Sequence, residues 1–240
     1  TTEIYTLSLH DALPISGDLS FIAIQPENSS GIYTLERKLK EGNKKIPFVK
    51  VQNTGPCSFA LTVVDENKRA IYYNEEFRQM IIKAMALKSR WQIQKMKPLA
   101  ENIICFIDEP ILSAFGSSTY VTVQREEVVA NLAEVIEAVH MDNAYAGIHC
   151  CGNTEWSILI DAGVDIVSFD AFQYGDTITM YADSVKPFLE KGGMIAWGII
   201  PTSAKIHEET PELLSNRLEQ LFENLAIKGI DKTLIAKQAL

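Results

Sequence analysis

The sequence predicts an α/β fold in which parallel strands alternate with helices, and three observations lead to this fold class. Short runs rich in β-branched residues alternate with longer stretches of helical period. No hairpin dipeptide joins one run to the next, which favours crossover helices between parallel strands. The length of 240 residues is near the size of a closed eight-stranded barrel, about 250 residues.

Seven runs are candidate strands, and polar residues follow several of them. The runs are Leu19 to Ile24, Phe48 to Gln52, Ile103 to Asp108, Tyr145 to His149, Asp165 to Asp170, Met194 to Ile199 and Leu234 to Lys237. A barrel and an open parallel sheet both place their sites at the carboxyl ends of the strands, so the pattern locates a site and leaves both architectures open. No glycine-rich phosphate-binding motif follows any strand, which removes the commonest reasons for a nucleotide-binding open sheet.

Three stretches between the candidate strands have helical period. Glu75 to Met96 carries apolar residues at intervals of three and four, and Gln124 to His140 and Pro211 to Ile227 repeat the pattern. Thr210 before Pro211 is a favourable helix start, with a capping hydroxyl followed by proline at the first helical position. Gly229 supplies a matching stop.

The two ends of the chain differ from the rest. Thr1 to Ser16 resembles a translated sequencing-adapter peptide, so residues 1–16 are interpreted as non-native and residues 17–240 as one domain. Leu234 to Leu240 has the composition of a strand that is just starting. We therefore expect a gene fragment that is open at both ends.

Composition excludes several classes of protein. The formal net charge is −9, and the basic residues are scattered, whereas nucleic-acid binding needs a concentrated cationic face. No apolar run approaches the roughly 18 residues that cross a bilayer, so a membrane protein is not expected. Four cysteines, two of them adjacent, do not form a secreted disulfide framework and favour the cytoplasm.

The strongest chemical motif is an H-x-C at the end of the apolar run Tyr145 to His149. In an extended chain His149 and Cys151 point to the same side, because side chains alternate with period two. Imidazole and thiolate are preferred ligands of zinc. The alternative interpretation, a strand-end histidine with two small buried thiols, is common, and two ligands alone do not make a site.

Acidic residues end two other candidate strands. Asp108 and Glu109 close Ile103 to Asp108, and Pro110 breaks the ladder so that the acids project into the loop. Such a pair can bind an ammonium group or orient a proton, although a helix cap or a solvated turn is equally compatible. Asp170 is a third acid at the same edge.

Five segments in this order resemble the catalytic barrel of cobalamin-independent methionine synthase and its short single-barrel relatives. They are VQNTGPCSFAL (51–61), FIDEPILSAFGS (106–117), GIHCCGNTEW (147–156), VDIVSFDA (164–171) and WGIIPTS (197–203). The same superfamily includes uroporphyrinogen decarboxylase and the zinc methyltransferases that act on coenzyme M. The resemblance implies a (β/α)8 TIM barrel, truncated, with its first strand and its C-terminal end missing.

The resemblance also implies roles for individual residues. His149 and Cys151 would bind a catalytic Zn²⁺, and Asp170 stands where a further zinc-binding carboxylate, usually a glutamate, is found. Asp108 would contact the amino group of an amino-acid thiol, with Glu109 beside it in the substrate site. Cys150 would point away into the barrel wall.

This chain departs from the family pattern in three places. The first strand with its glycine-serine substrate loop should precede Gly17, where the adapter-like peptide stands. A further zinc-binding cysteine of the family would lie beyond Leu240, and the folate-binding N-terminal barrel is absent. The sequence HCCGN at 149–153 is closer to that of the corrinoid-using methyltransferases than to that of the usual methionine synthases.

The predicted function is a zinc-dependent methyltransferase that moves a methyl group to a homocysteine-like thiol, giving methionine or a similar thioether. The donor would be methyl-tetrahydrofolate or a methylated corrinoid protein. Alternatives are a corrinoid-dependent enzyme acting on another thiol such as coenzyme M, a uroporphyrinogen decarboxylase-like enzyme, and a non-catalytic binding barrel. Arg125 is the one arginine near a strand end, which counts against a decarboxylase that holds carboxylates with basic residues.

Overall fold

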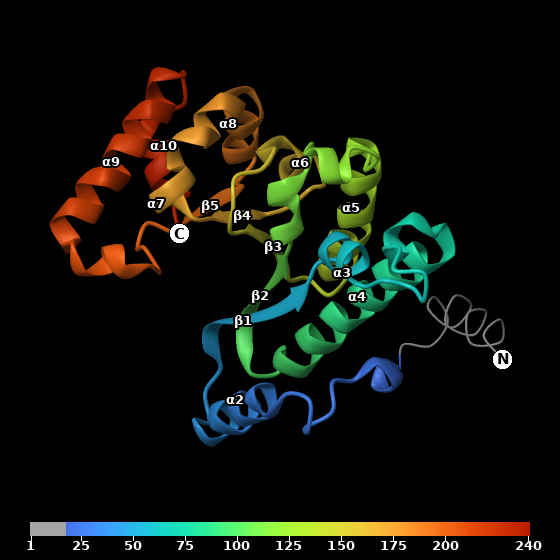
Figure 1. Cartoon of the computed structure of the whole chain (residues 1–240). Helices are drawn as coiled ribbons and strands as arrows, with labels where there is room; N and C mark the ends of the chain where they lie inside the picture. Colours follow the sequence, from blue (N-terminus) through green and yellow to red (C-terminus); the bar gives the residue numbers. More distant parts are fainter. Residues whose placement is uncertain (1–17) are drawn as a thin grey trace. The chain divides into compact units, whose positions relative to one another are not determined.

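The computed structural model describes residues 18–240, so the adapter-like segment at 1–16 lies outside the described residues. The described chain is an α/β structure whose strands pair in parallel, which confirms the predicted class (Figure 1). Its strands are β1 (Ile46–Thr54), β2 (Ala100–Asp108), β3 (Tyr145–Cys150), β4 (Ile166–Phe169) and β5 (Met194–Trp197). Residues 18–240 thus form five strands, where seven were predicted.

Helices fill the connections between strands. The α-helices are α2 (Ser30–Glu41), α3 (Pro56–Thr62), α4 (Glu75–Met96), α5 (Arg125–Met141), α6 (Trp156–Asp161), α7 (Ala171–Tyr174), α8 (Ala182–Glu190), α9 (Pro211–Ile227) and α10 (Lys232–Lys237). Short 3-10 helices are η1 (Ser20–Ile22), η2 (Ile71–Tyr73), η3 (Pro110–Ala114), η4 (Ser118–Tyr120), η5 (Gly175–Tyr181) and η6 (Ala204–His207).

The chain divides into two compact units. Among the described residues, the first contains 18–108 together with Ala130–Ala146, and the second contains Glu109–Val129 together with Gly147–Leu240. The boundary passes between Asp108 and Glu109, so the two predicted acids belong to different units.

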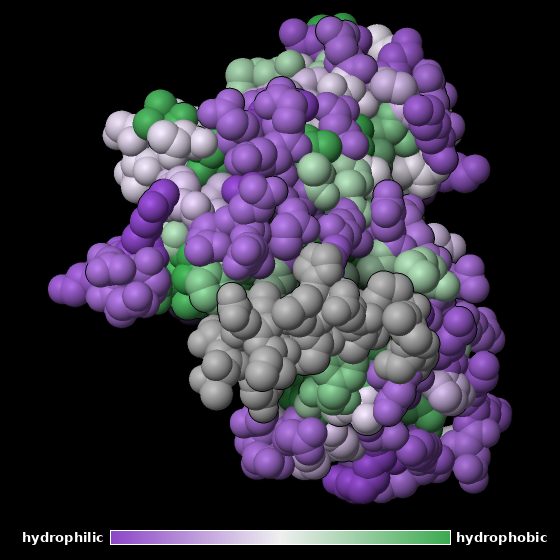
Figure 2. All heavy atoms as spheres, turned by 90° about the vertical axis from the view of Figure 1, so that its right-hand side faces the viewer, coloured by the Kyte–Doolittle hydropathy of each residue, from purple (hydrophilic) through white to green (hydrophobic). Residues whose placement is uncertain are grey.

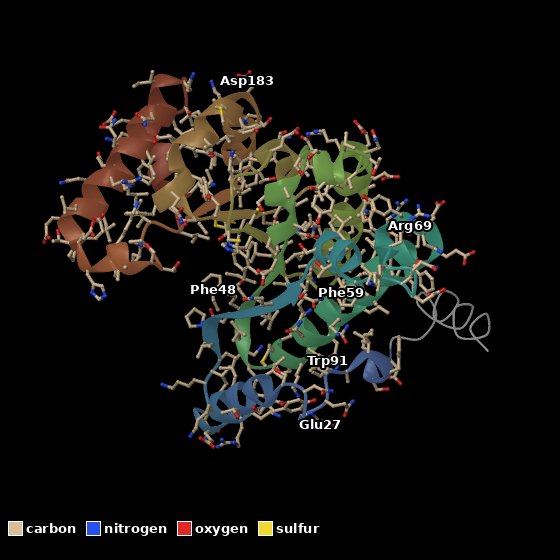
Figure 3. The ribbon with its side chains drawn as sticks, viewed as in Figure 1. Glu27, Phe48, Phe59, Arg69, Trp91 and Asp183 are labelled. Atoms are coloured by element: carbon tan, nitrogen blue, oxygen red, sulfur yellow. The ribbon has the colours of Figure 1, made fainter. Side chains whose placement is uncertain are left out.

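In the first unit, β1 pairs with β2 from Ile46 opposite Ala100 to Thr54 opposite Asp108. The long helix α4 packs on both strands and buries Ile82, Ile93 and Met96. Figure 3 shows Trp91 on the side of α4 that faces α2, where its ring centroid lies 6.5 Å from that of Tyr33. Lys95 on the same helix forms an ion pair with Glu36 at 2.5 Å and lies over the Tyr33 ring, so α2 is held to α4 by aromatic and charged contacts.

In the second unit, β4 lies between β3 and β5, with Val167 opposite Ile148 and Ile195. A row of aromatic rings forms part of its core. Trp156 contacts Phe169 at 4.8 Å between centroids, Phe169 contacts Trp197 at 5.6 Å, and Trp197 contacts Phe222 at 5.4 Å. The row ties α6, β4, β5 and α9 together.

The predicted helices are confirmed. α4 and α9 have the predicted bounds, and α5 is shifted by one residue. The side chain of Thr210 accepts a hydrogen bond from the backbone N–H of Leu213, and Pro211 occupies the first turn of α9. Gly229 has a φ of +88°, a left-handed conformation that ends this segment without the steric cost a Cβ would bring.

Two predicted strands are wrong. Leu19 to Ile24 contains the 3-10 helix η1 (Ser20–Ile22) and no strand, and Asp18 before it accepts a hydrogen bond from the backbone N–H of Ser20. Leu234 to Lys237 belongs to α10, because Asp231 caps a helix there through the N–H of Thr233. Parallel pairing with β5 begins only beyond this helix, at Ala239.

Figure 2 shows one face of the molecule, on which hydrophilic residues cover most of the surface and hydrophobic ones appear between them in scattered groups. Among the helices that the structure describes, none combines the length and the apolar character needed to span a bilayer.

Candidate functional site

The end of β3 separates the three side chains of the His149–Cys151 motif. Side chains alternate along this strand, so Ile148 and Cys150 are fully buried and His149 between them is half-buried. Cys151 follows in a bend after the strand and is the one exposed cysteine of the four, all of which are free thiols. The thiol that a metal or a reagent in solution can reach is therefore that of Cys151.

The His149 ring is positioned by the neighbouring strand. Ser168 on β4 stands opposite His149 in the register, and its Oγ lies 3.0 Å from Nδ1 of the imidazole. Metal-binding histidines are commonly held in this way by a partner on the second ring nitrogen, which fixes the tautomer and the ring orientation. Nε2 is then the nitrogen that a metal would use. Sequence reasoning missed Ser168, although it lies within the run Asp165 to Asp170 that was predicted as a strand.

Asp170, which was predicted as a zinc ligand, has a structural role in this fold. It caps the short helix α7, with Oδ1 accepting from the backbone N–H of Gln173 at 3.0 Å and Oδ2 accepting from Gln173 Nε2 at 2.6 Å. A metal ion would have to compete with these hydrogen bonds for the carboxylate. Asp170 is therefore a helix cap in this structure, and its use as a ligand remains a prediction.

Asp108 and Glu109 have different environments. Asp108 ends β2 in the first unit, where the side-chain amide of Gln52 donates to its carboxylate. Glu109 begins the second unit and is fully buried, and its backbone N–H donates to the carbonyl oxygen of His149 at 2.8 Å. Glu109 therefore lies in the loop after β2, as predicted, but is buried there instead of facing solvent.

Cys150 is enclosed by the loop that follows β3. Burial is the largest cause that raises the pKa of its thiol to about 11, and the nearby Glu109 carboxylate acts in the same direction. The backbone groups of Gly152 and Ser113 hydrogen-bond its sulfur and oppose this rise only in part. Cys150 is thus a neutral thiol at physiological pH, which makes it a poor nucleophile.

Gly152 allows this loop to close on η3. A Cβ at position 152 would lie 2.6 Å from the Cβ of Ser113, a separation that real side chains do not tolerate. Glycine is therefore required for the loop to approach η3 so closely beside His149 and Cys151.

The residues present fit a zinc ion in part. His149 and Cys151 bring an imidazole and a thiol to the end of one strand, and both are donors that zinc prefers. Within residues 18–240, however, no three histidine, cysteine or acidic side chains stand close enough together to hold a metal. His149 and Cys151 would thus be two of the three protein ligands that a catalytic zinc usually has.

Arg125, the one arginine that sequence analysis placed near a strand end, is occupied. Its guanidinium contacts Glu155 at 2.7 Å, Asp161 at 2.6 Å and the hydroxyl of Ser157 at 3.1 Å. These hydrogen bonds, that to Glu155 first, raise the pKa of Arg125. Arg125 therefore links α5 to α6, and its guanidinium group is already paired with carboxylates of the chain.

Comparisons with known proteins give no match, either to a protein-family model or to a curated protein.

Proposed function

We propose that this chain is a zinc-dependent methyltransferase that transfers a methyl group to a homocysteine-like thiol and so forms methionine or a similar thioether. The observation that carries the proposal is the end of β3, where His149 is held by Ser168 and is followed by the exposed Cys151. Five parallel strands with intervening helices are compatible with part of a (β/α)8 barrel, the architecture that belongs to this proposal.

In this proposal His149 Nε2 and Cys151 Sγ would hold the zinc. When bound, the ion supplies the Lewis acidity that deprotonates a thiol, which at its ordinary pKa of about 8.5 is mostly protonated at neutral pH. Ser168 positions the imidazole. The role predicted for Asp108, which is to orient the ammonium group of the acceptor, falls on a residue of the first unit and stays a prediction.

The bond changes are those of a simple displacement. The acceptor sulfur loses its proton to solvent and forms a bond to the methyl carbon, while the bond between that carbon and the donor breaks and leaves its electron pair on the donor. A folate nitrogen would take up a proton from solvent as it leaves, whereas the cobalt of a corrinoid would keep the electron pair. The donor would be methyl-tetrahydrofolate or a methylated corrinoid protein. The proposal includes a cytoplasmic setting, which the four free cysteines support.

One observation favours a second candidate, a uroporphyrinogen decarboxylase-like enzyme. Lys205 and Arg217 line a groove beside Phe172, and basic residues of this kind could hold substrate carboxylates. Sequence analysis considered only arginines near strand ends and so missed both. A metal-independent decarboxylation of a polycarboxylate, unaffected by Cys151→Ser, would support this alternative.

The zinc site is tested through the reactivity of Cys151. Because it is the only exposed cysteine, a thiol reagent should modify one thiol per folded chain rapidly. Added Zn²⁺ should slow this modification, and His149→Ala should remove the protection. Ser168→Ala should raise the zinc concentration needed by about tenfold or more, since loss of such a supporting contact typically costs 10- to 100-fold in metal affinity.

His207→Ala is the matched control, because His207 is an exposed histidine of the same unit at the end of η6. It should leave zinc protection unchanged. Protection that persists in His149→Ala, or that is absent from the unmodified chain, would contradict the proposed site. Asp170→Asn keeps a capping side chain and removes a carboxylate, so weaker protection in this variant would identify Asp170 as a ligand.

A further inference from the structure

A groove with two cationic side chains lies in the second unit, at the carboxyl end of its strands. It has a volume of about 410 Å³. Its lining residues come from α7, which follows β4 directly, from η6 and the segment after it, and from α9. Ligands of parallel α/β proteins bind at this edge of the sheet.

Phe172 organises the two cations. The guanidinium of Arg217 stacks on its ring, 4.5 Å from the centroid, and also donates to the carbonyl oxygen of Phe172 at 2.5 Å. The ammonium group of Lys205 lies 5.7 Å from the same centroid. Since Phe172 is almost fully buried, its ring is a fixed platform that holds both positive charges at one place.

Neither Lys205 nor Arg217 forms an ion pair within the described chain. Across residues 18–240, no carboxylate forms a salt bridge with Lys205 or Arg217. By contrast, Arg125 and Lys232 in the same unit each contact two carboxylates. Arg217 uses one nitrogen on the Phe172 carbonyl, which leaves further donors of its fork for a ligand.

The groove also contains groups that limit what can bind. Glu208 and Glu209 line it, so a ligand that is negative throughout would meet repulsion on that side. Gln173 lines it as well and bonds the carboxylate of Asp170 with its backbone and side-chain nitrogens. One residue thus connects the groove to the candidate zinc site.

We infer that this groove binds the oxyanion end of a small organic ligand, a carboxylate or a phosphate, between Arg217 and Lys205. The planar fork of an arginine matches either oxyanion, and a lysine adds a second charge-assisted hydrogen bond. The remainder of the ligand would extend past Gln173 toward Asp170. The inference does not depend on zinc or on methyl transfer.

The experiment measures the unfolding temperature of the full chain against increasing glutarate or inorganic phosphate, with sodium chloride added to keep ionic strength constant. Binding to the folded chain raises the unfolding temperature with saturation. Lys205→Ala changes an exposed side chain and should raise the half-saturating concentration roughly tenfold. Arg217→Gln should abolish the response, and Arg217→Lys, which keeps the charge, should restore part of it.

Lys191→Ala is the matched control, because Lys191 is an exposed lysine of the same unit outside the groove. It should respond as the unmodified chain does. Saturation by glutarate alone identifies a carboxylate ligand, saturation by phosphate alone identifies a phosphate, and saturation by both supports a general oxyanion site. The inference is overturned if neither anion raises the unfolding temperature more than chloride does at the same ionic strength. It is also overturned if the unfolding temperatures of Lys205→Ala and Lys205→Glu rise with the anions as that of the unmodified chain does. Failure here would leave zinc protection of Cys151 untouched, so the two proposals fail separately.

Discussion

Cys150 and Cys151 are adjacent in the sequence, but their thiol groups differ in exposure to solvent. Cys150 ends β3 facing the core, where burial raises its thiol pKa to about 11, whereas Cys151 lies in the bend beyond and is exposed. Alternation along a strand predicts this difference for Cys150 but does not extend into the bend. The accessible thiol is thus set by where the strand ends.

Gly152 allows the loop after β3 to lie close to Ser113, and replacing this glycine tests how much the close approach matters for stability. Gly152→Ala places a Cβ against Ser113, so we expect a loss of about 1–3 kcal/mol in the free energy of unfolding, the usual cost of overpacking. Urea unfolding would measure it. Ser113→Gly in the same chain should restore part of the loss.

Gly31→Ala is the control, because a Cβ there meets no atom within 4 Å in α2. Alanine in a helix is favoured over glycine by roughly 0.5–1 kcal/mol, so this variant should be as stable as the original or more stable. Equal effects of the two replacements would show that the contact with Ser113 is unimportant.

Among the elements, helices were predicted better than strands for a physical reason. The bounds of α4 and α9 follow from long periodic patterns with a cap or a proline at the start. The run at Leu234–Lys237 is only four residues long, and periodicity cannot distinguish a strand from a helical turn over that length. The capping bond from Asp231 decides in favour of the helix.

In the candidate site, too, residues marked by a local sequence pattern were predicted, and residues that depend on tertiary contacts were missed. Strand ends placed Asp108, His149 and Asp170 at the carboxyl edge, since the sequence shows where apolar runs stop. Ser168 and Arg217 were missed because their roles depend on the register of β3 with β4 and on the packing of α9 against α7. Such partners are 19 and 45 residues apart and follow no local pattern.

The cap of α9 provides a test at the scale of the element. Thr210→Ala removes the acceptor for the N–H of Leu213, so the free energy of unfolding should fall by about 1 kcal/mol. Chemical denaturation measures the change. Ser215→Ala, at an exposed position inside the same helix, should cost nothing, and a similar loss from both would argue against capping.

For the whole molecule, a buried thiol in each unit makes stability depend on alkaline pH. Burial raises the pKa of Cys105 in the first unit to about 12, and that of Cys150 in the second to about 11, above the ordinary thiol value of about 8.5. Between about pH 9 and 11 the unfolded thiols lose protons that the folded thiols keep. Unfolding is therefore favoured as pH rises, by about 1.4 kcal/mol per unit of pKa difference.

We expect the free energy of unfolding in urea to fall from pH 9 to pH 11. The double variant Cys105→Ala and Cys150→Ala should show a smaller fall, because other titrating groups are the same in both chains. A pH dependence identical in the two chains would contradict the assignment to these thiols.

The placement of the aromatic residues has a spectroscopic consequence. Of the three tryptophans, Trp91 is half-buried against α2 in the first unit, whereas Trp156 and Trp197 are buried in the aromatic row of the second. Each unit therefore carries its own intrinsic fluorophore. With Trp91 replaced by phenylalanine the emission reports the second unit alone, and with Trp156 and Trp197 replaced it reports the first, so the unfolding of each unit becomes visible by itself.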